Sequence, residues 1–150
     1  MNMENIDQNL VIGVDVGGQT SKCGIVDTRG TVIAQTVIRT DNHDSVEPFI
    51  AELAEALKKL IAEAGAQGKI RGIGVGAPNA NYYTGDIENA VNLSWGRSGS
   101  IHFAAMLKDA MGGIPVTLTN DANAAAMGEM TYGAARGMNN LFVVCVCNTV

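Results

Sequence analysis

The residues with the clearest chemical potential lie in the stretch VDVGGQTSKCG, which spans residues 14–24. Here an apolar run ends in an acidic residue, two glycines, three polar residues and a lysine. Glycines carry no Cβ, and a turn that presents several backbone N–H groups in one direction suits an anion. Gln19, Thr20 and Ser21 add side-chain hydrogen-bond donors, and Lys22 adds a positive charge. The residues predicted to bind phosphate are Gly17, Gly18, Gln19, Thr20 and Lys22.

Asp15 begins the same turn and would repel a phosphate that touched it directly. A carboxylate in this place suits Mg²⁺, which proteins commonly hold through one or two carboxylates, waters and substrate phosphates. The pattern therefore predicts Asp15 as a ligand of Mg²⁺. A plain β-hairpin with an exposed aspartate explains the same residues, and this stretch alone does not separate the two interpretations.

A second polar site follows a predicted strand in LTNDANAAAMGE, residues 118–129. Asn120 or Asp121 could simply cap the helix that follows, which is the commonest use of these residues at that position. Two observations weigh against that explanation. The residues after Asp121 are small enough to let another element approach closely, and the carboxyl end of a strand is where α/β sheets bind ligands. The pattern therefore favours a ligand-binding role.

Two familiar nucleotide-binding patterns fit this sequence poorly. The P-loop pattern needs a lysine followed by serine or threonine, and no lysine here has that neighbour. The dinucleotide-binding pattern needs glycines at the first, third and sixth places of a turn that opens a helix. In GIGVGAP, residues 72–78, the third glycine comes at the fifth place and a proline follows. Residues 14–24 therefore remain the best candidate.

Strands and helices alternate along the chain and must position these residues. Three apolar runs joined by short turns predict an antiparallel meander, and apolar residues at steps of three and four predict a helix from Ser45 to near Gly65. The order predicts an α/β domain with a mixed sheet and flanking helices. The expected strands are 10–16, 21–27, 31–39, 69–78, 114–120 and 140–147; further helices are expected at 101–112 and 121–135, and turns over 79–99.

Composition narrows the class of protein. The chain has 150 residues, 47% of them hydrophobic, which suffices for one globular domain with a core. A formal charge of -5 argues against nucleic acid or an acidic membrane as partner. The first nine residues lack the apolar segment of a signal peptide, so a cytoplasmic protein is expected. Cys23, Cys145 and Cys147 are expected to be reduced thiols, because a zinc site needs four ligands.

Three stretches together resemble the ROK family (repressor, open reading frame, kinase), and within it the glucokinase-like members. They are DVGGQTSKCGIVD, GIGVGAPNANYYTGDIENAVNLSW and NDANAAAMGE, in the same order and spacing as in the family. The resemblance implies a ribonuclease-H-like lobe of the actin-like ATPase type, with a mixed sheet of five or six strands. It implies that residues 1–150 form the first of two lobes.

The resemblance also implies roles for single residues. The 15–22 turn matches the family's first phosphate loop, which holds ATP phosphates and Mg²⁺, although Gln19 stands where the family commonly has threonine. Asp121 matches the catalytic base, and Asn120 the neighbour that hydrogen-bonds sugar hydroxyls. Asn79 stands where the family has the glycine of a sugar-facing loop. Within the NLSW stretch at residues 92–95, the leucine and tryptophan are expected to be buried and structural.

The function implied is ATP-dependent phosphorylation of a hexose, with glucose as the expected sugar and a homo-oligomer as the expected assembly. A sugar-binding regulatory or non-catalytic ROK protein is the alternative; the acidic chain, with nine residues before Leu10, disfavours a repressor. After its NLFVV-like strand the family continues into a second phosphate loop, whereas this chain reads CVCNTV and stops. We therefore expect a truncated chain that is inactive alone.

Overall fold

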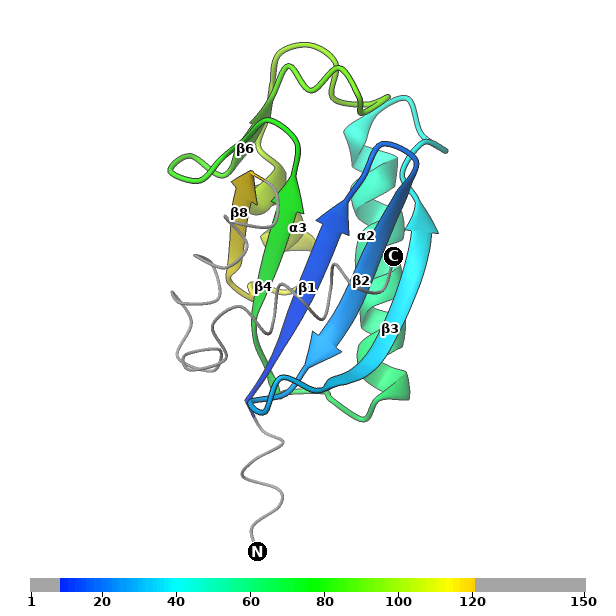
Figure 1. The fold of residues 1–150 in the computed structure, drawn as a ribbon, viewed down its shortest axis with the longest axis vertical. Coiled ribbons are helices and arrows are strands. Elements are labelled where there is room, and N and C mark those ends of the chain that lie inside the picture. Colours follow the sequence, from blue (N-terminus) through cyan, green and yellow to red (C-terminus); the bar gives the residue numbers. More distant parts are fainter. Residues whose placement is uncertain (1–8, 121–150) are drawn as a thin grey trace, which may run out of the picture.

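The sequence folds around a five-stranded mixed sheet, which a computed structural model describes within residues 9–120. The strand order is β3-β2-β1-β4-β8 (Figure 1). β1 is antiparallel to β2, and β2 to β3, whereas β1 and β4, and β4 and β8, are parallel. The mixed sheet and the meander predicted from the sequence are therefore confirmed. The strands are β1 (Leu10–Val16), β2 (Thr20–Val26), β3 (Val32–Arg39), β4 (Ile70–Ala77) and β8 (Val116–Asn120).

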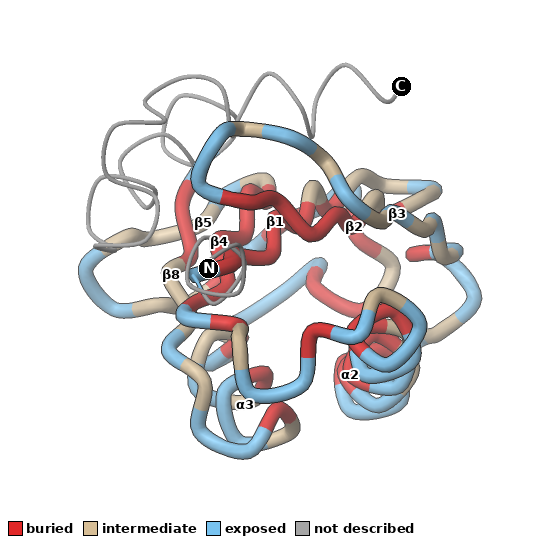
Figure 2. The backbone as a smooth tube through the Cα atoms, turned by 90° about the horizontal axis from the view of Figure 1, so that it is seen from below, coloured by how far each residue is buried: buried red, intermediate tan, exposed pale blue. Residues whose placement is uncertain are grey.

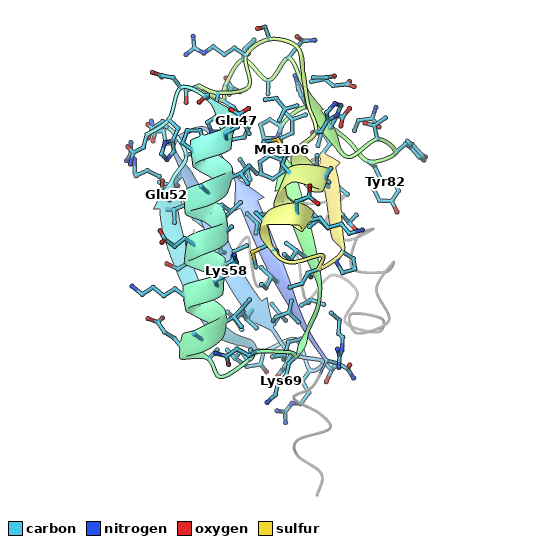
Figure 3. The ribbon with its side chains drawn as sticks, turned by 180° about the vertical axis from the view of Figure 1, so that it is seen from behind. Glu47, Glu52, Lys58, Lys69, Tyr82 and Met106 are labelled. Carbon is cyan, nitrogen blue, oxygen red and sulfur yellow. The ribbon has the colours of Figure 1, made fainter. Side chains whose placement is uncertain are left out.

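Both described helices cover the same face of the sheet (Figure 2). α2 runs from Val46 to Glu63, and its apolar stripe is buried, as the spacing predicted. Gly65 follows the helix at a φ of +66°, a left-handed conformation that glycine adopts without steric cost. α3 spans Phe103–Ala110, which is shorter than the predicted helix at both ends. Glu47 and Lys58 lie on the exposed side of α2 (Figure 3).

Three aromatic rings join the helices to the segment after β4. Phe49 of α2 stacks on Trp95 with ring centroids 4.7 Å apart, and Trp95 stacks on Phe103 of α3 at 5.8 Å. Leu93 is fully buried beside them, and Trp95 is 6% exposed. The expectation that this leucine and tryptophan have buried structural roles is confirmed. No helix within residues 9–120 is long and apolar enough to cross a membrane.

The segment after β4 contains more structure than the turns predicted for residues 79–99. Three short strands form a second sheet in the order β5-β6-β7, namely β5 (Ala80–Asn81), β6 (Asp86–Glu88) and β7 (Ser100–Ile101). Strands of two or three residues are too short to show an alternating pattern, so the sequence carried no signal for them. Tyr82 projects from this part of the molecule, away from both helices (Figure 3). The predicted helix 121–135 and strand 140–147 lie outside the described residues.

Candidate active site

The residues predicted to bind phosphate surround one open depression at the β1–β2 turn. Its volume is ≈ 480 Å³. Every residue that the sequence assigned to phosphate and to Mg²⁺ contributes to its wall, and one further residue comes from the segment after β6. The lining residues are Asp15, Gly17, Gly18, Gln19, Thr20, Lys22 and Asn92. The fold therefore brings the predicted phosphate-binding residues to a single concave surface.

Asp15 and Lys22 place opposite charges beside each other in this depression. They are direct cross-strand partners in the antiparallel β1–β2 pair, and Asp15 is also in register with Gly76 of the parallel strand β4. Cross-strand partners project from the same face of a sheet. Neither side chain forms an ion pair with any residue between 9 and 120. The lysine is thus available to an anion and the carboxylate to a cation.

Gly17 and Gly18 are required by the protein's own backbone. A Cβ on Gly17 would lie 2.8 Å from the carbonyl oxygen of Thr20, and one on Gly18 would lie 2.9 Å from that of Asn92. Real Cβ atoms essentially never come this close to another heavy atom. From the sequence alone, the approach of a phosphate explains both glycines. The structure supplies a second and sufficient reason, which is close packing within the turn and against Asn92.

Thr40 holds the turn from behind. Its backbone N–H donates to the Gln19 carbonyl oxygen at 2.8 Å, and its hydroxyl bonds to that of Ser21 at 2.6 Å. The Thr40 carbonyl accepts a hydrogen bond from Trp95 Nε1 at 3.1 Å. Ser21 and Thr40 are both fully buried. Ser21 therefore supports the turn from inside, and its hydroxyl is not one of the donors that the turn offers to a ligand.

The residues predicted to face the sugar lie at the same edge of the sheet. The parallel strands β1, β4 and β8 end at a common edge of the sheet (Figure 1). Asp15 lies one residue before the end of β1, Asn79 two residues after β4, and Asn120 at the end of β8. Asn120 is exposed and in register with Ala77. The predicted base, Asp121, lies outside the described residues.

Asn79 has a structural task that limits its contact with a sugar. Its φ is 57°, and its Nδ2 donates to the carbonyl oxygens of Glu88 and Asn89 at 3.0 and 2.9 Å. Asparagine tolerates this left-handed conformation better than most residues. Because both amide hydrogens are used, only its Oδ1 could accept a hydrogen bond from a sugar hydroxyl. Asn79 lines a different depression from the phosphate turn.

The donor set suits Mg²⁺ better than a metal enclosed by protein ligands. Within residues 9–120 no three side chains of His, Cys, Asp or Glu gather into a metal site. Mg²⁺ in phosphoryl-transfer sites takes most of its ligands from water and the substrate phosphates, so one carboxylate, Asp15, fits that chemistry. Cys23 is a buried free thiol, as expected, and burial raises its pKa to about 12. It is therefore unsuited to act as a metal ligand or nucleophile.

The sheet order, the helices on one face and the polar carboxyl edge define a lobe of the actin-like ATPase fold. Residues 11–149 match the ROK family, and the chain belongs to it. A glucokinase of Halalkalibacterium halodurans is 36% identical over 138 residues. A ROK hexokinase from Thermus thermophilus is 34% identical with a TM-score of 0.62, over 85% of this chain and 40% of that one. A Streptomyces griseus glucokinase in complex with glucose and AMPPNP is 28% identical with a TM-score of 0.59, over 86% and 38%.

The match covers most of this chain but less than half of the length of the relatives named above. The H. halodurans alignment spans 89% of this chain and 40% of the glucokinase. Regulators occur among the relatives as well, including a xylose repressor of Caldicellulosiruptor bescii that is 26% identical over 95% of this chain and 35% of its own length. Family membership is therefore compatible with either catalysis or regulation.

Proposed function

We propose that this chain is the first lobe of an ATP-dependent hexose kinase, with glucose as the expected hexose. One observation carries the proposal. All the residues predicted to bind the ATP phosphates and Mg²⁺ line a single depression, and it lies at the sheet edge where Asn120 ends β8. The glucose and AMPPNP bound by the S. griseus relative agree with this pair of substrates.

In this proposal each group has a separate task. Phosphoryl transfer depends mainly on positioning and on neutralising charge, because its transition state is loose. The Gly17 N–H is used within the turn, where it donates to the Thr20 carbonyl oxygen at 3.0 Å. The N–H groups of Gly18 and Gln19 and the ammonium of Lys22 bind phosphate oxygens. Asp15 holds Mg²⁺, which when bound supplies positive charge to the phosphates. Asn120 orients a sugar hydroxyl, since an amide can both donate and accept, and Asp121 accepts that hydroxyl's proton.

The replacement Asp121→Asn tests the proposal in a protein that joins this chain to the second lobe of a ROK kinase. We expect kcat for hexose phosphorylation to fall by about 10²-fold or more while sugar affinity changes only a few fold, because the proton acceptor is lost but the shape is kept. Asp109→Asn is the matched control, since Asp109 is exposed on α3. A kcat near that of the parent protein would show that Asp121 is not the base.

A sugar-binding regulator is the second candidate, supported by the xylose repressor among the relatives. The two candidates differ in turnover. A kinase releases ADP in a sugar-dependent way, whereas a regulator binds sugar without consuming ATP. The chain spans about 40% of the length of the H. halodurans glucokinase, and we infer that these 150 residues do not turn over alone. The assay therefore uses the two-lobe protein, and sugar binding without ADP release would favour the regulator.

A further inference from the structure

Asn92 is the part of the phosphate depression that the sequence did not assign. Among the described lining residues it alone comes from outside the β1–β2 hairpin. It lies against the turn itself, because a Cβ placed on Gly18 would be 2.9 Å from the Asn92 carbonyl oxygen and 3.9 Å from the Asn92 Cβ. Asn92 is thus held at the wall of the depression by direct backbone contact.

The segment that carries Asn92 is tightly held on its C-terminal side. Backbone hydrogen bonds join Ala90 N–H to the Gly96 carbonyl at 2.7 Å, Leu93 N–H to the Ala90 carbonyl at 3.0 Å, and Gly96 N–H to the Leu93 carbonyl at 2.9 Å. Leu93 and Trp95 are buried in the core. Ser94 Oγ donates to the His43 carbonyl oxygen at 2.7 Å. Asn92 is therefore presented from a closed turn whose neighbours cannot move freely.

The Asn92 side chain is unused within this arrangement. It is exposed, and its amide makes no hydrogen bond with any residue between 9 and 120. By contrast, Asn79 and Asn89 use their side-chain amides to hold the second sheet and its loops. An exposed amide on a rigid turn, at the wall of a concave polar site, is suited to bind a ligand because little conformational freedom is lost.

We propose that the Asn92 side-chain amide donates hydrogen bonds to the phosphate chain of the bound triphosphate. The inference rests on the proposed function and adds a phosphate-binding residue to it. Phosphate is favoured over sugar as the ligand because Asn92 shares its depression with Gly18 and Lys22, whereas neither Asn79 nor Asn120 lines it. Lys22 contributes a positive charge to the depression beside the carboxylate of Asp15, and amide N–H groups are good donors to phosphate oxygens.

The test titrates tripolyphosphate, with and without Mg²⁺, into the 150-residue chain and records nitrogen–proton NMR spectra. We expect the Asn92 side-chain amide signals to shift along the same saturation curve as the backbone amides of Gly17 and Gly18. Removing a hydrogen bond to a charged group should weaken affinity about tenfold in Asn92→Ala. Asn92→Asp should weaken Mg²⁺-free binding further, because it adds a like charge beside the phosphates.

Asn42→Asp provides the matched control for that charge change. Asn42 is also exposed, but it does not line the depression, so its replacement should leave affinity within about twofold. The Gly17 and Gly18 amide signals could shift while Asn92→Ala and Asn92→Asp bind tripolyphosphate as tightly as Asn42→Asp does. In that case Asn92 does not bind phosphate, and the proposed phosphate site at the β1–β2 turn is kept. If no amide of the turn shifts at all, both the inference and the proposed phosphate site are wrong.

Discussion

The buried hydroxyl pair behind the phosphate turn allows a quantitative test of how the turn is held. Ser21 Oγ and Thr40 Oγ1 are 2.6 Å apart, both residues are fully buried, and neither hydroxyl has another described partner within residues 9–120. Thr40→Val keeps the side-chain shape and the backbone bonds to Gln19 and Trp95, but it leaves the Ser21 hydroxyl without a partner. A buried unsatisfied polar group costs about 1–3 kcal/mol, so the free energy of unfolding should fall by that amount.

The double variant Ser21→Ala with Thr40→Val separates this interaction from simple loss of volume. Because both polar groups are then removed together, its destabilisation should be smaller than the sum of the single effects by about 1–2 kcal/mol. Urea unfolding of the 150-residue chain measures each value, and the slope of the transition checks that the unfolded state is unchanged.

A third threonine serves as the control for the chemical change. Thr36 of β3 is only partly buried and makes no described side-chain hydrogen bond, so Thr36→Val should change stability by no more than about 0.5 kcal/mol. Additive effects of Ser21→Ala and Thr40→Val would refute a stabilising hydrogen bond between the two hydroxyls. A Thr40→Val variant as stable as the parent would refute it equally.

Gly18→Ala should lower stability by about 1–3 kcal/mol, since the new Cβ meets a backbone carbonyl that cannot rotate away, whereas Gly24→Ala, whose Cβ would make only ordinary contacts, should cost less. Thermal melts of both variants compare these costs, and equal melting temperatures would argue against the contact with Asn92. Burial raises the pKa of Cys23 to about 12, above its ordinary value of 9.0, so its thiol should resist alkylation in the folded chain at about pH 8. Because the unfolded thiol loses its proton first, stability should be unaffected by this group below about pH 9 and should fall as pH rises towards 12. Cys23→Ala should remove that part of the decline, and an unchanged pH profile would contradict the burial effect.

The sequence by itself determined the elements whose signals are local. Apolar residues at helical spacing predicted α2, which runs from Val46 to Glu63, and continuous apolar runs predicted the strands of the main sheet. The glycine and polar residues of the 15–22 turn predicted the phosphate site, because each of those residues is informative through its own chemistry. These features can be predicted from the sequence because each depends only on residues within a few positions of one another.

Only the tertiary structure decided which distant segments complete the site. Trp95 and Thr40 are 55 positions apart in the sequence, yet the indole N–H of one binds the carbonyl of the other behind the phosphate turn. Gly18 meets Asn92 through a backbone contact that no side-chain pattern encodes. Packing against a shared core brings such segments together, and periodicity along one segment says nothing about its partner. For that reason only the structure showed that Asn92 and Thr40 belong to the site. Asp15, Gly17 and Lys22 could be assigned to it from the sequence.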